Sequence, residues 1–77
     1  MIDELNSQIG VRVHVRRRQI GLTQKQVAQA AGITTQQIQK YEDGLARISA
    51  ARLWQFSRIL CVEPIFFYEE LDASGAA

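Results

Sequence analysis

Residues 24–43 read QKQVAQAAGITTQQIQKYED, and this stretch decides the fold. Its first half places three apolar residues at helical spacing, namely Val27, Ala28 and Ala31. Gly32 then interrupts the pattern, since glycine readily adopts the positive φ that ends a helix. The first half therefore predicts a short helix over residues 24–31 that ends at Gly32.

The second half predicts another helix, over residues 35–43. Ile38 and Tyr41 are apolar residues three positions apart, as one face of a helix requires. Ala28 and Gly32 are small, which allows two crossing helices to approach closely. This combination is typical of a helix-turn-helix, whose second helix enters the major groove of DNA. The alternative is an αα-hairpin that packs and has no further role.

The face opposite Ile38 and Tyr41 is polar. It carries the hydroxyl, amide and ammonium groups of Thr35, Gln36, Gln37, Gln39 and Lys40. Such groups can donate to and accept from base edges, and glutamine can bond adenine through two hydrogen bonds. The second helix is therefore the candidate recognition helix.

The composition suits one small globular domain without a cofactor. The chain has 77 residues, of which 47% are apolar, and a chain of this length buries only about 60% of its unfolded surface. Cys61 is the single cysteine, which excludes an internal disulfide and favours a reducing, cytoplasmic location. With one histidine and no CxxC motif, we expect no metal. No apolar run or signal-peptide pattern suggests a membrane.

The net charge is only +1, but the charges are unevenly distributed. Residues 10–47 carry seven basic and two acidic residues, whereas residues 1–9 and 48–77 each carry a net charge of −2. A basic middle between acidic ends fits a protein that presents one face to phosphate groups.

A first helix is expected from a cap at Asn6 or Ser7 to about residue 19, closed by Gly21. The alternation of apolar and polar residues from Ile9 to Val15 also fits a strand, which is the alternative. The basic run at residues 16–18 favours the end of a helix, since cations are stabilised there. We therefore predict a helix.

The remaining elements follow from caps. Thr23 and Gln26 have the spacing of a capping box at the start of the helix over residues 24–31. Ser49 can cap a fourth helix, and Pro64 suits the first position of a fifth. The expected ranges of these two helices are 50–61 and 64–71. The whole chain then divides into a lead-in over residues 1–8, a domain over residues 9–71 and a disordered tail over residues 72–77.

These motifs resemble the Xre/Cro-like branch of the lambda-repressor-like helix-turn-helix regulators. The resemblance spans about residues 9–71 and is carried by Gly21-Leu22-Thr23-Gln24, Val27-Ala28, Ala31-Gly32-Ile33, Ile38, Tyr41-Glu42-x-Gly44, Leu53, Leu60 and Val62. It implies an all-α fold, a compact five-helix lambda-repressor-like bundle. It also implies binding to a palindromic operator, as a homodimer, through the major groove.

The resemblance further implies roles for individual residues. Base contacts are expected from Thr34, Thr35, Gln36, Gln37 and Lys40. Phosphate contacts are expected from Arg17, Arg18, Thr23, Gln24 and Arg47, although an exposed basic helix end without a partner is an alternative for Arg18. Arg17 is expected to pair with Glu42 and so to tie the first helix to the third, a task that suits the planar guanidinium.

The chain departs from the family pattern at three positions. Arg16 stands where the family usually has an apolar residue, Cys61 where the fourth helix usually ends in glycine, and Glu63 where a Ser-type cap is usual. We expect Cys61 to be a small apolar filler. Arg12 and His14 are expected at the surface, without ligand roles.

Aromatic residues near the C-terminus exceed what five short helices can hide. Trp54, Phe66 and Tyr68 are expected nearer the surface than the other aromatic residues. Since exposed aromatic clusters mark interfaces, we expect them to form a homodimer interface. The alternative is partial burial within the monomer.

Together these features predict a sequence-specific DNA-binding transcriptional regulator whose partners are double-stranded DNA and a second copy of the chain. The alternative is the DNA-binding antitoxin of a toxin–antitoxin pair, in which the aromatic surface binds a toxin. An adaptor that binds only proteins is a third possibility. An enzyme is not expected, because the chain offers no nucleophile with a positioned base and no paired carboxylates.

Overall fold

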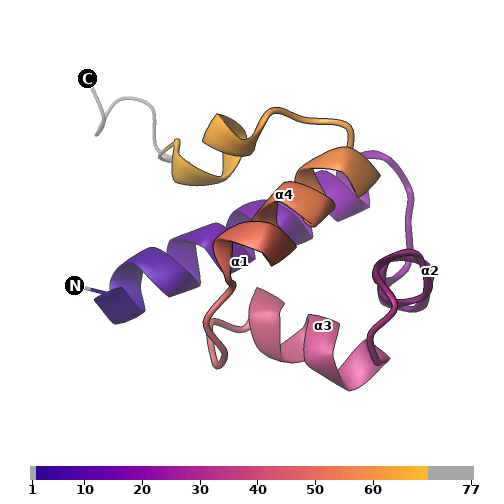
Figure 1. Cartoon of the computed structure of the whole chain (residues 1–77), viewed down its shortest axis with the longest axis horizontal. Coiled ribbons are helices and arrows are strands. Elements are labelled where there is room, and N and C mark those ends of the chain that lie inside the picture. The colour runs from indigo at the N-terminus through magenta and orange to yellow at the C-terminus, as the bar shows by residue number, and fades with distance from the viewer. Residues whose placement is uncertain (1, 70–77) are drawn as a thin grey trace.

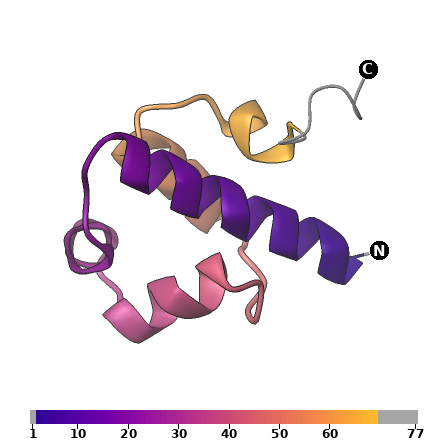
Figure 2. The ribbon, with the colours of Figure 1, turned by 180° about the vertical axis from the view of Figure 1, so that it is seen from behind.

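A computed structural model describes residues 2–69 of the chain, and this part is all-helical. Four α-helices and one 3-10 helix follow in the order α1 (Ile2–Gln19), α2 (Gln24–Ala31), α3 (Thr35–Glu42), α4 (Ala50–Ile59) and η1 (Pro64–Tyr68). The long α1 crosses the molecule, with α3 on one side of it and η1 on the other (Figures 1 and 2). The predicted all-α class is confirmed, with a 3-10 helix in place of the fifth α-helix.

The hydrophobic core draws residues from every element. Its buried members are Ile9, Val13, Val27, Ala28, Ala31, Ile38, Tyr41, Leu53, Phe56, Leu60 and Phe67. The rings of Tyr41 and Phe56 meet edge to face, with centroids 5.7 Å apart, and so join α3 to α4. This aliphatic and aromatic core fixes the positions of α2 and α3, which are too short to be stable on their own.

Helix α1 is longer than the sequence predicted. It begins at Ile2, so Asn6 and Ser7 lie inside the helix and the expected cap there is wrong. The predicted helix over residues 9–15 is confirmed, and Ile9 and Val13 are buried on one face of it. Val11 faces solvent instead, and nothing in the described part of the chain forms a strand.

Gly10 allows α1 to lie directly on the end of α3. A Cβ atom at this position would collide with the backbone carbonyl of Tyr41 and lie 2.9 Å from the carbonyl oxygen of Glu42. Any larger residue would push the two helices apart, since backbone atoms cannot move aside as a flexible side chain can. The side chain of Glu42 is therefore presented to α1 at very short range.

All four α-helices end in the same backbone motif. A residue with positive φ follows each helix: Gly21 (77°), Gly32 (74°), Gly44 (75°) and Cys61 (58°). The next residue then donates its N–H to the carbonyl five positions earlier, in the bonds Leu22 to Arg17, Ile33 to Ala28, Leu45 to Lys40 and Val62 to Ser57. This is the Schellman motif, in which glycine is usual at the positive-φ position. Cys61 adopts it in spite of its side chain.

The C-terminal elements differ from the prediction. Helix α4 ends at Ile59 instead of residue 61, and η1 replaces the α-helix expected over residues 64–71. The carbonyl groups of Phe66 and Glu69 accept hydrogen bonds from Arg12 and Gln8 of α1, at 3.1 Å each. The Phe66 carbonyl also accepts the backbone N–H of Glu69 at 3.4 Å, which is the three-residue spacing of a 3-10 helix. The expected tail over residues 72–77 lies outside the described residues.

Arg16, which stands where the family usually has an apolar residue, also binds the C-terminal part of the chain. Its Nε donates to the carbonyl of Leu60 at 2.8 Å, one residue after α4 ends. Gln8, Arg12 and Arg16 are spaced four residues apart and thus line one face of α1. We call these three residues the α1 ladder. Its side chains donate to backbone carbonyl groups at the end of α4 and at η1.

Candidate nucleic-acid interface

Both helices of the helix-turn-helix are capped by threonine. The Thr23 hydroxyl accepts the backbone N–H of Gln26 at 3.0 Å, and the Gln26 side chain accepts the N–H of Thr23 at 2.8 Å. The predicted capping box is therefore present at α2. At α3 the Thr34 hydroxyl accepts the N–H of Gln37 at 3.1 Å. These caps satisfy backbone donors that a helix start leaves open, and fix where each helix begins.

Helix α3 has one face in the core and the other in solvent. Ile38 is fully buried and Tyr41 nearly so, whereas Thr35, Gln36, Gln39 and Lys40 are all exposed. Gln37 lies between the two faces and donates to the Tyr41 hydroxyl at 3.2 Å. In Figure 1 α2 is seen end-on while α3 lies across the view, so the two helices cross steeply and α3 forms an edge of the molecule.

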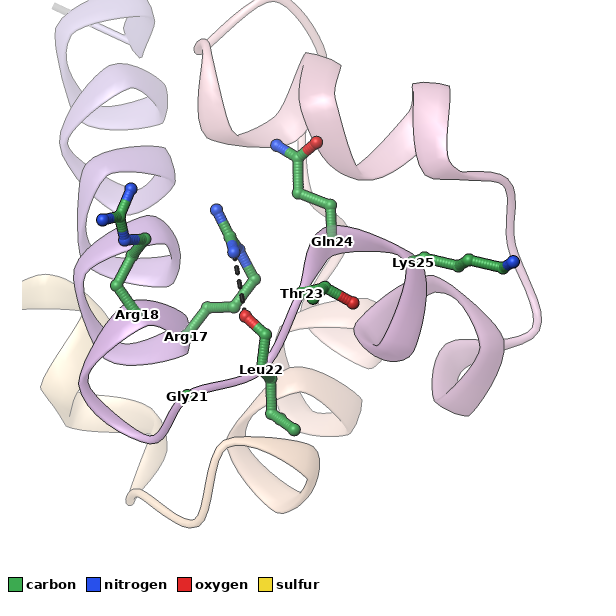
Figure 3. Close-up of a pocket in the computed structure, with 7 residues that line it drawn as sticks. All are labelled: Arg17, Arg18, Gly21, Leu22, Thr23, Gln24 and Lys25. Atoms are coloured by element: carbon green, nitrogen blue, oxygen red, sulfur yellow. Dashed lines mark hydrogen bonds between the residues drawn. The ribbon is translucent and has the colours of Figure 1, made fainter.

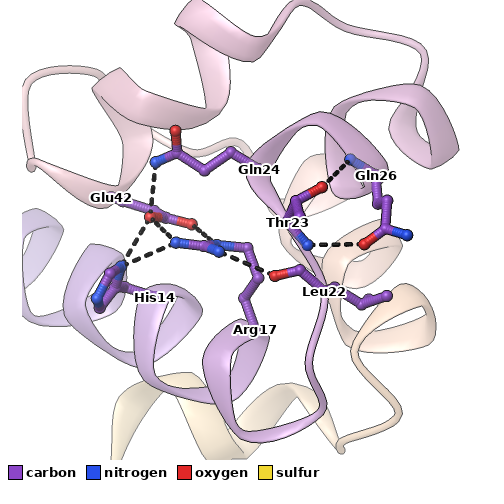
Figure 4. A network of polar contacts seen from close by, with 7 residues as sticks. All are labelled: His14, Arg17, Leu22, Thr23, Gln24, Gln26 and Glu42. Carbon is purple, nitrogen blue, oxygen red and sulfur yellow. Dashed lines mark hydrogen bonds and ion pairs between the residues drawn. The ribbon is translucent and has the colours of Figure 1, made fainter.

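Glu42, at the end of α3, is the acceptor of a polar network that joins three helices (Figure 4). Its Oε2 accepts from Nε of Arg17 at 2.7 Å. Its Oε1 accepts from Nη2 of Arg17 at 3.1 Å and from Nε2 of Gln24 at 3.0 Å, and lies 2.9 Å from Nδ1 of His14. The structure thus brings together the Arg17–Glu42 pair expected from the resemblance, and adds two members.

The network keeps the Glu42 carboxylate ionised. Burial alone raises the pKa of this carboxyl group, because a low-dielectric surrounding disfavours charge. Hydrogen bonds from Arg17, His14 and Gln24, together with the charge of Arg17, outweigh burial and hold the pKa below its ordinary value. The carboxylate therefore stays charged at neutral pH and keeps all of its donors engaged.

Arg17 positions helices and has little surface left for a phosphate group. Its side chain is 8% exposed, and Nη1 donates to the carbonyl of Leu22 at 2.9 Å. All three guanidinium nitrogens thus have partners inside the domain. This geometry disfavours the phosphate contact expected of Arg17. His14 lies at the surface as expected, with 44% of its side chain exposed, but it does not stand alone: its Nδ1 lies 3.1 Å from Nη2 of Arg17, three residues later on the same face of α1.

A basic cleft of about 580 Å³ lies where α1 meets α2 (Figure 3). Its lining comprises Arg17, Arg18, Gly21, Leu22, Thr23, Gln24 and Lys25. Arg18 and Lys25 are exposed on opposite sides of the cleft, with Thr23 and Gln24 between them. The start of α2 adds the partial positive charge of a helix N-terminus. Lys25 was not among the expected phosphate contacts, although its place at the start of α2 indicates that role.

The remaining predicted phosphate contact is Arg47. It is exposed in the loop between α3 and α4. The cleft lies at the start of the helix-turn-helix, and the loop that carries Arg47 follows its end. The polar face of α3 therefore lies between the two along the chain. Cations flanking an array of donors and acceptors match the needs of a nucleic-acid surface.

Comparison with known sequences gives the family. Residues 14–67 match the sequence family described as helix-turn-helix. The chain belongs to the helix-turn-helix family. An uncharacterised HTH-type transcriptional regulator of Sinorhizobium medicae is 43% identical over 67 residues, which cover 87% of this chain and 48% of the relative. An uncharacterised transcriptional regulator of Rhodospirillum rubrum is 39% identical over 71 residues, covering 92% and 66%. The chain spans about half the length of the Sinorhizobium relative.

Solved structures of helix-turn-helix regulators share the fold. The restriction–modification controller protein C.AhdI from Aeromonas hydrophila superposes with a TM-score of 0.77 at 23% identity, over 83% of this chain and 96% of that one. The clp gene regulator ClgR from Corynebacterium glutamicum superposes with a TM-score of 0.82 at 19% identity, over 94% and 74%. The family match and the relatives confirm the predicted resemblance to Xre and lambda-repressor-like regulators, and the two solved structures share the fold.

The expected aromatic patch of this helix-turn-helix domain is only partly free. Trp54 on α4 is 61% exposed and Tyr68 on η1 is 47% exposed. Phe66 is half-buried instead, with the Arg12 guanidinium 3.9 Å from its ring centroid and the Phe67 ring against it. Phe66 is thus committed within the monomer, and the expectation that Arg12 is an ordinary surface residue is wrong. Ile65, 62% exposed, was missed.

Two further expectations concern metals and membranes. Within residues 2–69 no three His, Cys, Asp or Glu side chains gather in a way that would hold a metal ion. The same residues include no helix with the length and apolarity that a membrane crossing needs.

Cys61 is exposed, so its expected role as a buried filler is wrong.

Proposed function

We propose that this chain is the sequence-specific DNA-binding domain of a transcriptional regulator. One observation carries the proposal: α3 buries Ile38 and Tyr41 while Gln36 and Lys40 remain exposed at an edge of the molecule. Relatives with 39–43% identity are named transcriptional regulators, which supports the regulatory role. Helix α3 enters the major groove, where each base pair presents a distinct pattern of donors and acceptors.

In this proposal two sets of residues divide the work. Bases are contacted by Thr35, Gln36 and Lys40, with Thr34 and Gln37 beside them. Phosphates are held by Arg18, Thr23, Gln24, Lys25 and Arg47. Arg17 and Glu42 fix α1 to α3, so the base-contacting face keeps its angle to the phosphate-binding cleft. Phosphate contacts set the register and base contacts supply the sequence preference.

The regulator binds a palindromic operator as a homodimer. A two-fold dimer places two copies of α3 in successive major grooves, about 34 Å apart. The exposed apolar side chains of Trp54, Ile65 and Tyr68 supply the surface for the second copy, since they are more apolar than a solvated face needs. Phe66 is not part of this surface, because it packs under Arg12.

Selection of bound DNA from a random pool tests the proposal. We expect a consensus made of two inverted half-sites whose centres are about one helical turn apart. Recovery of DNA without any consensus contradicts sequence-specific binding, and recovery of a single unrepeated half-site contradicts the two-fold dimer. Size measurements in solution on the pure protein give the oligomeric state independently of DNA.

The antitoxin alternative gains no support from these relatives and neighbours, which are named as regulators.

A further inference from the structure

Leu45 is the exception among four equivalent positions. In each Schellman motif the residue after the positive-φ position is apolar. These residues are Leu22, Ile33, Leu45 and Val62. In this motif the apolar residue usually packs back against its own helix or the core. Leu22, Ile33 and Val62 do so, since each is half-buried against the core. Leu45 is 76% exposed, more than any other large apolar side chain of the described residues.

The backbone of Leu45 is fixed even though its side chain is free. Its N–H donates to the carbonyl of Lys40 at 2.9 Å, and the N–H of Gly44 donates to the carbonyl of Tyr41 at 3.1 Å. The side chain is thus presented at a set position relative to α3. A side chain on an ordered backbone loses less entropy when a partner covers it than one on a mobile segment, so Leu45 is well placed for recognition.

The surroundings of Leu45 indicate what that partner is. Leu45 lines a shallow groove of about 390 Å³ together with Gln36, Gln39, Lys40 and Asp43, all on the outer side of α3. Gln36 and Lys40 are the side chains that the proposed function assigns to bases. Whatever meets these two residues also meets Leu45.

We propose that Leu45 is a specificity-determining residue, whose side chain contacts the 5-methyl group of a thymine in the major groove. The thymine methyl is the apolar group that base pairs display in this groove, and aliphatic side chains contact it. Since Leu45 follows the C-terminal end of α3, the thymine lies next to the base contacted by Lys40 and away from the base contacted by Thr35. This inference rests on the proposed function and extends it to a base class.

Replacing thymine by deoxyuridine tests the contact, because it removes the methyl group and leaves every hydrogen-bonding group in place. Each thymine of the selected operator is replaced singly, and the dissociation constant is measured for the wild type and for Leu45→Ala. We expect one thymine per half-site at which the wild type loses about fourfold in affinity, the value for one buried methyl-sized group. At that thymine Leu45→Ala loses nothing further. Equal losses for both proteins at every thymine overturn the proposal.

Two matched variants complete the experiment. Leu5→Ala truncates an exposed leucine of α1 that has no part in the proposed DNA or dimer contacts, and it should keep the wild-type response to deoxyuridine. Leu45→Val keeps an aliphatic group and should retain part of the response. Leu45→Ala should unfold at the wild-type temperature, because its side chain is exposed and buries nothing in the monomer. Loss of self-association in Leu45→Ala would assign the residue to the contact between copies and overturn the proposal.

The proposed function and the role of Leu45 give different results when they fail. If the random pool yields no preferred sequence with the wild type, the proposed function fails and the role of Leu45 fails with it. If the wild type selects an operator but the effects of Leu45→Ala and deoxyuridine are additive at every thymine, the role of Leu45 alone fails.

Discussion

Glu42 receives more hydrogen bonds than any other side chain in the polar network. His14, Arg17 and Gln24 converge on it from α1 and α2, while Glu42 itself closes α3. Its side chain is 3% exposed, so water cannot replace a partner that is lost. Breaking a buried pair by removing one member is costly, because the other member remains buried and unpaired.

Glu42→Gln should lower the free energy of unfolding at neutral pH by about 2–4 kcal/mol, since it leaves the Arg17 charge without a counter-charge. The folded-state pKa of Glu42 lies below its ordinary value of 4.5, so ionisation stabilises the fold above that value. This contribution is lost as the pH falls through the folded-state pKa. Urea unfolding of both proteins at several pH values should therefore show a smaller difference under acid conditions. A difference that stays constant or grows toward low pH contradicts the assignment.

Cys61→Gly should stabilise the protein by about 1 kcal/mol, because a positive φ strains any residue with a side chain and glycine adopts it freely. Cys61 has a φ of 58° and is exposed, so its side chain contributes little packing that would be lost. Gly32→Ala is the matched opposite change, at a φ of 74° and with no neighbouring heavy atom within 4 Å of the added Cβ. Thermal unfolding under reducing conditions should rise for the first variant and fall for the second.

At the scale of elements, α1 acts as the axis to which the others are attached. Its ladder of Gln8, Arg12 and Arg16 binds backbone carbonyls of α4's end and of η1, and Gly10 admits the end of α3. Arg12 and Arg16 make charge-assisted hydrogen bonds to carbonyl groups, which are stronger than the neutral bond that Gln8 makes.

Arg16→Ala should lower the free energy of unfolding by about 1–3 kcal/mol, because the buried end of α4 loses a charged donor to the Leu60 carbonyl. Arg18→Ala is the matched control on the same helix, since Arg18 is exposed, and it should change stability by less than about 0.5 kcal/mol. Chemical unfolding of the two variants provides the comparison. Similar losses in both would mean that helix propensity, and not the carbonyl contact, sets the effect.

The helix-turn-helix could be predicted closely because its signals are local. The range of α2 follows from Thr23, Gln26 and Gly32, which act on neighbouring backbone groups. The start of α1 was misplaced because Asn6 and Ser7 can cap a helix but can also lie within one, and the sequence alone does not separate the two cases. The attachment of η1 to α1 could not be foreseen, since its hydrogen bonds join residues 54 and 61 positions apart in the chain.

The candidate site shows the same division. The polar face of α3 and the Arg17–Glu42 pair follow from spacing and from the family resemblance. His14, Arg12 and Lys25 were missed or misplaced, because their roles depend on which faces of α1 and α2 meet their neighbours. For His14 the signal was available in principle: it precedes Arg17 by three residues, which places both side chains on one helical face.

At the scale of the whole molecule, the basic residues gather around the helix-turn-helix while the chain as a whole is nearly neutral. Binding to phosphates releases counterions, so affinity for DNA should fall linearly with salt concentration on logarithmic axes. Lys25→Ala should reduce the slope by about 0.9, the share of one phosphate contact. Arg58→Ala, an exposed arginine of α4, should leave the slope unchanged. Equal changes in both variants contradict a phosphate contact localised at the cleft.

Gln36→Ala and Arg47→Ala should separate preference from affinity. Loss of a base contact should cost about 1–3 kcal/mol against the preferred operator and little against unrelated DNA. Loss of a phosphate contact should weaken binding to both DNAs alike. Measuring both variants on the selected operator and on a scrambled duplex gives the four values needed. If the two variants lose operator preference to the same extent, the division of roles is wrong.

The division of α3 into a buried face and an exposed face has a practical consequence. Thr35, Gln36 and Lys40 can be exchanged together, because the interior is filled by Ile38 and Tyr41 and the carboxylate of Glu42 stays in place. A combinatorial library at these three codons should consist largely of folded members. Under the proposed function, such variants reach new target sites without rebuilding the scaffold, and duplicated copies of the gene diverge in what they regulate while sharing one architecture.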